Sequence, residues 1–288
     1  MSWQLLLYIN LAAGTIRELL NKKISNTVSL FAGLFYITLF AQVFFYVSWV
    51  FTSQTLPRYD LYASLCGILI VAGFSFYFAA LRISLTQSIL FQSYSILVTI
   101  LLSAVFLGES KYFDIRTFSG IKVVSGTILA FLALWFLLHQ KNKKEERLEK
   151  KWFYYIAGTI LFLGIGSFFS ISFIHRLTPT EIFINQANTM IPLYLVLIFI
   201  GKEKLSIGKK MLAFTFINAL VSAIAAVAFY KGLLLMPVAK FYPLQQLSLV
   251  ILTMITGWIF YHEKDLFTKQ KLRGMILGLA GMLLLITS

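Results

Sequence analysis

The chain has 288 residues, of which 59% are hydrophobic, 16% aromatic and only 12% charged, and its formal net charge is +14. Soluble domains contain about 45 to 50% apolar residues. This composition, with a mean hydropathy of +0.83, excludes an ordinary soluble domain and predicts a membrane protein. A strong positive charge can indicate nucleic-acid binding, but the basic residues cluster in loops between apolar segments, which argues against a nucleic-acid partner.

The first apolar segment, residues 3–20, is interpreted as a membrane-spanning helix, because it lacks the basic start and cleavage site of a secretory signal. Arg17 and Glu18 project about 100° apart on a helix, so they are not expected to pair well. Glu18 is the one acidic residue of the predicted helices away from a loop, which makes it the candidate for proton coupling. Its nearness to Asn21 and Lys22 favours instead a carboxylate at the membrane interface.

Further apolar segments follow along the chain. Five uncharged ones exceed the ~18 residues that span a bilayer: 28–51, 61–81, 83–107, 152–174 and 182–200. Three more contain one lysine each: 117–138 (Lys122), 211–236 (Lys231) and 237–261 (Lys240). The last, 274–288, spans only if Leu272 belongs to it and the neighbouring Lys271 and Arg273 reach the interface. The sequence therefore predicts an all-α polytopic membrane protein with ten transmembrane helices.

Lysine and arginine are unevenly divided between alternate loops. If ten helices alternate, 17 of the 25 fall on one side of the membrane, and Arg58, Lys111, Arg116 and Arg176 are the 4 on the other. An excess of basic residues in short loops marks the cytoplasmic side, so the loops place both termini outside. The basic run at 141–151, KNKKEERLEKK, is interpreted as a connector facing anionic lipid headgroups, with a partner-docking module as the alternative.

This connector divides the chain into halves, residues 1–140 and 152–288, that share a weak internal repeat. At a displacement of 154 positions, Phe106 aligns with Phe260, Glu109 with Glu263, Phe113 with Phe267 and Gly120 with Gly274. All four pairs fall between the fourth and fifth helix of each half. Because five helices is an odd number, the halves would cross the membrane in opposite directions, and such inverted repeats are typical of secondary transporters.

The motif of an LGE turn followed by a glycine and an apolar helix resembles the EamA family of the drug/metabolite transporter superfamily. It occurs here as FLGESKYFDIRTFSG and, less faithfully, as FYHEKDLFTKQKLRG, and GLLLMPVAKFYPLQQLSLVIL is similar to the family's turn between helices 8 and 9. The resemblance implies a multi-pass transporter of the cell membrane, commonly drawn with both termini in the cytoplasm, opposite to the loop charges. The family's frequent arginine in the second helix of a repeat is replaced by Gly33 and Gln186, so no anion-binding role is carried over from it.

The segment VAFYKGLLLMPVAKFYPLQQ, residues 227–246, carries the embedded Lys231 and Lys240. At ~1.5 Å per residue both lie within about 8 Å of one membrane face, so snorkelling to the interface is one interpretation. Pro237 and Pro243 are expected to interrupt or kink the start of the next helix. An interrupted helix that lines a cavity can bind a ligand, which is the other interpretation.

Polar residues around this turn complete the candidate substrate site. Gln246 aligns with Gln92 in the repeat, and equivalent positions of an inverted repeat meet near one axis at the midplane; an ordinary interhelical hydrogen bond is the alternative. The candidate binding residues are Lys231 and Lys240 to attract an anion, Gln92 and Gln246 to orient the solute, Tyr230 and Tyr242 for stacking and hydroxyl contacts, and also Gln186 and Tyr77.

No residue pattern indicates an enzyme, a cofactor or a metal site. The sole cysteine is Cys66, and the three histidines lie far apart, so no ligand spacing is present. We therefore expect a secondary transporter that moves a small metabolite, such as an amino acid or another carboxylate-bearing solute, by alternating access. A lipophilic-cation exporter coupled through Glu18 and a non-transporting scaffold are the alternatives. The expected partners are the solute and the lipid bilayer; a coupling proton or counter-solute, and monomer or homodimer, stay open.

Overall fold

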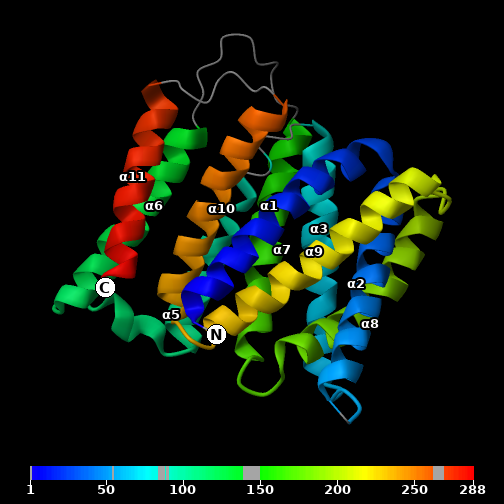
Figure 1. Ribbon diagram of the computed structural model, residues 1–288, viewed down its shortest axis with the longest axis horizontal. Coiled ribbons are helices and arrows are strands. Elements are labelled where there is room, and N and C mark those ends of the chain that lie inside the picture. The colour runs from blue at the N-terminus through cyan, green and yellow to red at the C-terminus, as the bar shows by residue number, and fades with distance from the viewer. Residues whose placement is uncertain (1, 54, 84–87, 89–90, 139–149, 262–268) are drawn as a thin grey trace.

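The computed structural model describes residues 2–288 except 54, 84–87, 89–90, 139–149 and 262–268. The basic connector therefore lies outside the described residues up to position 149, and so do Glu263 and Phe267 of the predicted repeat. Within the described part, the regular structure is ten α-helices and one 3₁₀ helix. In chain order, with the labels of Figure 1, they are α1 (Trp3–Thr27), α2 (Leu30–Thr52), α3 (Leu61–Ile83), α5 (Ser95–Phe106), η1 (Glu109–Phe113), α6 (Phe118–Leu138), α7 (Lys150–Ser172), α8 (Pro179–Ile200), α9 (Lys209–Leu233), α10 (Val238–Tyr261) and α11 (Lys269–Ile286).

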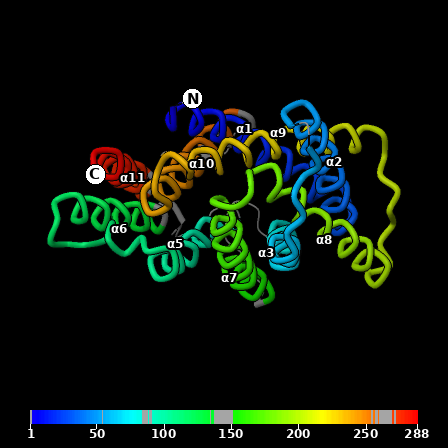
Figure 2. Tube along the Cα trace, turned by 90° about the horizontal axis from the view of Figure 1, so that it is seen from below, coloured from blue at the N-terminus to red at the C-terminus, as the bar shows by residue number. Residues whose placement is uncertain are grey.

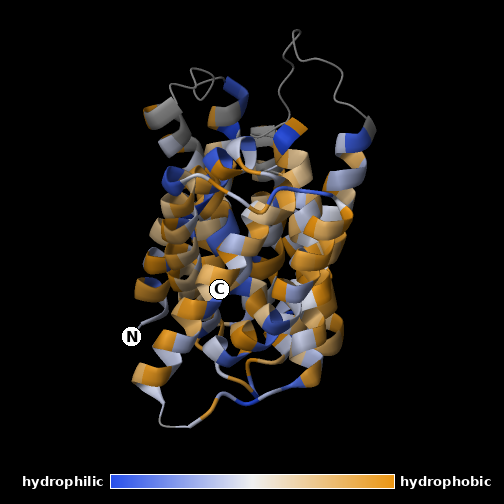
Figure 3. Cartoon of the chain, turned by 90° about the vertical axis from the view of Figure 1, so that its right-hand side faces the viewer, coloured by the Kyte–Doolittle hydropathy of each residue, from blue (hydrophilic) through white to orange (hydrophobic). Residues whose placement is uncertain are grey.

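The helices agree with the all-α prediction. Five of them are long and apolar enough to cross a membrane: α2, α3, α8, α9 and residues Lys151–Ser172 of α7. Figure 3 shows hydrophobic residues along most of the helix lengths and hydrophilic ones gathered toward the ends. The helical segments of this chain are thus those of a membrane protein.

Several helix boundaries differ from the prediction. α1 continues to Thr27, seven residues past the predicted end at position 20. The predicted helix over 83–107 is not continuous, because the chain forms a turn at Ser93 and Tyr94 before α5 begins at Ser95. Pro243 is the sixth residue of α10 and lacks the N–H that would bond to the carbonyl of Ala239, but the helix continues through it. Pro237 precedes the helix.

The helices form two rows that mix residues from both halves of the chain. Seen from below, α1, α9 and α10 lie along one side and α3, α5 and α7 along the other, with α6 and α11 at one end and α2 and α8 at the opposite end (Figure 2). The closest helix pairs are α6 with α11, α3 with α7 and α1 with α9. Each pair joins a helix from before the connector to one from after it, so the fold is held together mainly by contacts between the halves.

Glycines allow the closest of these approaches. A Cβ atom at Gly281 of α11 would stand 2.9 Å from the carbonyl oxygen of Gly126 in α6, and one at Gly67 of α3 would stand 2.5 Å from the carbonyl oxygen of Gln186 in α8. Small residues at such positions permit the backbone contact that drives helix association in lipid. The approach at Gly67 also sets the position of Gln186.

The N-terminus of α8 shows how local sequence fixes a helix start. The sequence TPTE forms a capping box: the Thr178 hydroxyl accepts a hydrogen bond from the Glu181 amide, and the Glu181 carboxylate accepts one from the Thr178 amide. Pro179 occupies the first helical turn, where it is favoured. Glu181 also accepts a hydrogen bond from the amide of Arg58, 3.0 Å away, which ties α8 to the loop between α2 and α3.

Candidate functional site

A cavity of about 280 Å³ lies between the two halves of the chain. Its lining residues come from α1, α2, α3, α5 and the residues just before it, α7, α8, α9 and α10. None of the described residues of α6 or α11 lines it. This volume is near the lower end for ligand pockets, so the cavity suits a small solute.

The two walls of the cavity differ in chemistry. One wall is apolar and aromatic and is built by α2, α3 and part of α8, with Leu34, Ile37, Phe45, Phe74, Phe78 and Met190. The other is rich in amides and hydroxyls and is built by α1, α7, α10 and the start of α5, with Asn10, Arg17, Gln92, Ser167, Gln245 and Gln246. An amphipathic solute would find a matching surface on both sides.

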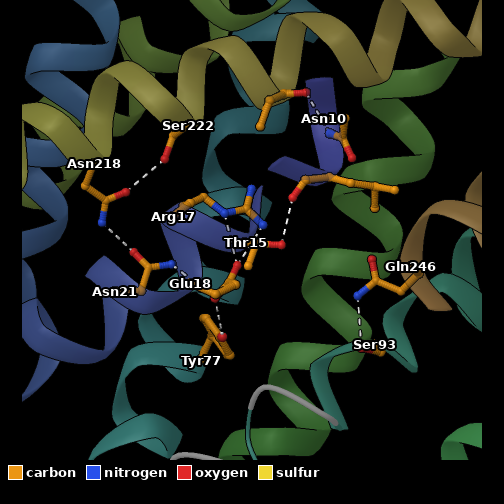
Figure 4. A network of polar contacts seen from close by, with 12 residues as sticks. Asn10, Thr15, Arg17, Glu18, Asn21, Tyr77, Ser93, Asn218, Ser222 and Gln246 are labelled. Carbon is orange, nitrogen blue, oxygen red and sulfur yellow. Dashed lines mark hydrogen bonds and ion pairs between the residues drawn. The ribbon is translucent and has the colours of Figure 1, made fainter. Parts of the chain in front are cut away.

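The structure brings together five of the eight predicted binding residues. Gln92, Gln186, Tyr230, Tyr242 and Gln246 all line the cavity. The Gln246 carboxamide donates a hydrogen bond to the Ser93 hydroxyl at 2.9 Å (Figure 4), and Gln186 donates to Ser170 at 2.7 Å. These amides are therefore both hydrogen-bonded to neighbouring helices and part of the cavity surface.

The two lysines do not belong to this cavity. Lys231, in the last turn of α9, is exposed. Lys240 is partly buried, and its ammonium group donates a hydrogen bond to the carbonyl oxygen of Ser288 at 2.5 Å. Neither side chain lines the cavity, so the cation on its wall is Arg17 of α1 and not either lysine.

Arg17 and Glu18 form an ion pair, contrary to the expectation that neighbouring residues would not pair. Nε and Nη2 of Arg17 donate to Oε1 of Glu18 at 3.0 and 2.7 Å (Figure 4). The long arginine side chain bends back along the helix, so the angle between the two Cβ directions does not prevent contact. The pairing is possible because both residues face protein rather than lipid.

Glu18 is buried in the interior of the protein. Its side chain is only 4% exposed, and because α1 ends at Thr27, nine residues on, Glu18 lies about 13 Å inside the helix end. The Tyr77 hydroxyl donates to Oε2 of Glu18 at 3.0 Å, and Asn21 donates to the same oxygen at 3.3 Å. Tyr77 thus contacts Glu18, and neither residue is among those that line the cavity.

Sequence reasoning did not single out Asn10 or Arg17 as binding residues. Asn10 donates to the carbonyl oxygen of Ala225 at 2.8 Å and accepts from Gln245 at 2.9 Å, which joins α1 to α9 and α10. The spacing of Asn10, Arg17 and Asn21, separated by seven and four positions, places all three on one helical face. This row of polar residues on one face of an apolar helix is the sequence pattern that could have identified Asn10 and Arg17 as candidates.

Two carboxylates fasten the halves to each other at opposite ends of the bundle. Glu109 in η1 accepts hydrogen bonds from the amides of Val238 and Ala239, at the start of α10, at 2.9 and 3.0 Å. Glu203, after α8, accepts bonds from the first amides of α2, at 2.8 and 3.1 Å. Each is an anion at a helix N-terminus, an arrangement favoured by the helix dipole. Burial raises the pKa of Glu109 above its ordinary value, although the two amides act in the opposite direction.

Within the described residues, no group of three histidine, cysteine, aspartate or glutamate side chains could hold a metal ion. The cavity wall consists of amides, hydroxyls, aromatic rings and one guanidinium group. Such a surface can bind and orient a solute by hydrogen bonding and apolar contact.

The fold is shared with solved structures. Among 27 chains that match, one crystal structure of a protein superposes with a TM-score of 0.75 over 98% of this chain and 95% of that chain, at 13% sequence identity. No curated protein matches the sequence significantly. The model of the EamA-like transporter family matches residues 150–287, a family of membrane transporters of the drug/metabolite type. The second half of the chain, residues 150–287, is thus similar to the EamA-like transporter family, which agrees with the resemblance identified from the sequence.

Proposed function

We propose that this chain is a secondary transporter that moves a small, carboxylate-bearing metabolite across a cell membrane by alternating access through the cavity. The observation that carries the proposal is the cavity itself, which is lined by helices from both halves. Secondary transporters built from inverted repeats hold their solute at the interface between the repeats and move one repeat against the other.

The positions that line the cavity support an inverted repeat of ten spanning helices. The lining residues of α2 are 34, 37, 38, 41 and 45, and those of α8 are 183, 186, 187, 190 and 194, each displaced by 149 positions. On α3 and α9, positions 70, 74 and 78 recur as 222, 226 and 230, each displaced by 152. The same faces of corresponding helices therefore meet the cavity, as a twofold relation between the halves requires.

Helix contacts are reciprocal in the same way. α1 packs against α9 and α10, while α7, its counterpart in the second half, packs against α3 and α5. α2 packs against α9 and α3 against α8, and the remaining close pairs, α2 with α8 and α6 with α11, join counterparts. A twofold axis between the halves produces this pattern, and no sequence identity is needed for it.

The two carboxylate fasteners supply a structural basis for alternating access. Glu109 joins the halves near the start of α10, at the lower end in Figure 1, and Glu203 joins them near the start of α2, at the upper end. Opening either end of the cavity separates the halves there and releases the corresponding fastener. We expect one to be broken in each open state.

The test is transport by the purified protein in liposomes against a panel of amino acids, other carboxylates and lipophilic cations. Uptake or exchange of a carboxylate-bearing solute supports the proposal. Movement of cationic compounds alone contradicts it.

A lipophilic-cation exporter is the second candidate, because Glu18 is a buried carboxylate in the interior of α1. The pairing of Glu18 with Arg17 speaks against it, since the negative charge is already neutralised. A Glu18→Gln variant should lose all transport if Glu18 exchanges a cation for a proton. It should keep transport of a carboxylate-bearing solute under the main proposal.

A further inference from the structure

The ion pair between Arg17 and Glu18 lies at the polar wall of the cavity. Of the lining residues that the structure describes, only Arg17 carries a formal charge. Its side chain is 28% exposed, whereas that of its partner Glu18 is 4% exposed. A solute in the cavity therefore reaches the guanidinium group of Arg17 and not the carboxylate behind it.

Glu18 is fixed from three helices. Oε2 accepts from Tyr77 of α3 and from Asn21 of α1. Asn21 in turn accepts from Asn218 of α9 at 2.8 Å, and Ser222 donates to Asn218 at 3.0 Å (Figure 4). This chain of hydrogen bonds holds the carboxylate in place, so Glu18 is a fixed counter-charge for Arg17.

Arg17 retains binding capacity in this arrangement. Nε and Nη2 are directed to Glu18, and among the described residues Nη1 has no hydrogen-bond partner. A guanidinium group presents five N–H donors in a planar fork and can serve two carboxylates at once. Arg17 can therefore bind a carboxylate from the cavity without leaving Glu18.

Acceptors for a positive group also line the cavity. Gln186, Gln245 and Gln246 donate their amide hydrogens to Ser170, Asn10 and Ser93. Their carboxamide oxygens accept no hydrogen bond from the described part of the protein, and all three residues line the cavity. These oxygens are suited to an ammonium group, which has donors and no acceptor.

We propose, on the basis of the transport function above, that the cavity selects a zwitterion: Arg17 binds its carboxylate, the carboxamide oxygens bind its ammonium group, and the apolar wall takes its side chain. Because Arg17 and Glu18 sum to zero, a solute of zero net charge leaves no unbalanced charge in the interior. A simple carboxylate or amine leaves one, and an unbalanced buried charge is costly. The class of solute is therefore an apolar amino acid rather than a carboxylate in general.

The experiment is a binding measurement by calorimetry on the purified protein. The probes are the apolar amino acids leucine, isoleucine, valine, methionine and phenylalanine, each with an analogue that lacks the ammonium group and one that lacks the carboxylate. For leucine these are 4-methylpentanoate and 3-methylbutylamine. We expect both analogues to bind about tenfold or more weakly than the amino acid, because each loses a charged hydrogen-bonding group.

Two variants separate the roles of the pair. In Glu18→Gln the site gains a net positive charge, so 4-methylpentanoate should gain affinity relative to leucine. In the double variant Arg17→Gln with Glu18→Gln, which leaves no unpaired charge and so preserves the fold, leucine should bind about tenfold to a hundredfold more weakly. Lys122→Met is the matched control, because Lys122 bonds to the Thr287 carbonyl oxygen and lies outside the cavity.

The outcomes separate this inference from the proposed function. If no apolar amino acid binds the wild-type protein, or if the double variant binds leucine as well as wild type, the inference is overturned. It is likewise overturned if Glu18→Gln leaves the order of the three probes unchanged. If the protein in liposomes transports other carboxylates, the proposed transport function still holds. If an amino acid binds with this charge pattern but is not transported, the transport function is contradicted and the binding site is supported.

Discussion

Replacing Gly67 by alanine tests the close approach of α3 to α8 that positions Gln186. The new Cβ would stand 2.5 Å from the carbonyl oxygen of Gln186, where ordinary contact begins at 3.4 Å, so the helices must separate by about 0.9 Å. Overpacking of this kind costs about 1–3 kcal/mol. The atom in the way is backbone, so a rotamer change cannot relieve the clash.

Gly33→Ala is the matched control, because Gly33 also lies inside a helix but its Cβ would meet the nearest atom, a methyl group of Ile24, at 3.4 Å. Both substitutions gain about 1 kcal/mol of helix propensity, so the difference between them isolates the clash. We expect Gly67→Ala to melt several degrees below Gly33→Ala in a thermal unfolding assay of the purified protein, and to weaken solute binding as Gln186 shifts. Equal or higher stability of Gly67→Ala would refute the close packing of α3 and α8.

Three further predictions follow from the site and its surroundings. Lys231→Met and Lys240→Met should each leave liposome transport near the wild-type rate, since neither lysine lines the cavity. A large loss of transport in either variant would indicate that the substituted lysine takes part in solute binding. Burial raises the pKa of Glu109, so the folded protein binds the proton of this carboxyl group more tightly than the unfolded chain does. The stability of wild type relative to Glu109→Gln should therefore fall as the pH rises from ~4.5 towards the raised pKa. Unfolding measured across that pH range would show no such trend if the carboxyl group were solvated. With Ser2→Cys and Lys204→Cys in separate cells, an impermeant thiol reagent applied from outside should label only Ser2→Cys if the loop charges set the orientation, and the reverse labelling would place both termini in the cytoplasm.

The sequence was sufficient to predict the helical, apolar character of the chain, because the length of an apolar segment can be read without knowledge of packing. The helical character and the family resemblance are confirmed. Boundaries were less predictable: α1 continues through Lys22 and Lys23 because its second half packs against α9 and α3, and hydropathy does not register such contacts.

The two candidate residues chosen through the internal repeat line the cavity, whereas the two lysines chosen by depth alone do not. Gln92 and Gln246 line the cavity, in agreement with their equivalent positions. Lys231 and Lys240 were chosen because a charge in an apolar segment is costly, but a lysine near a helix end can avoid that cost by reaching the protein surface. The Arg17–Glu18 pair escaped prediction because a nearest-neighbour contact depends on the surrounding helices, which force both side chains into the same interior space.

The contact of α6 with α11 has a consequence for how the molecule can change shape. These helices meet backbone to backbone at Gly126 and Gly281, and none of their described residues reaches the cavity. The α6–α11 pair therefore joins the two halves of the chain at a place where no described residue contacts the solute cavity. This part of the cohesion between the halves is carried by residues that do not bind the solute, so substitutions in the cavity leave the α6–α11 contact unchanged.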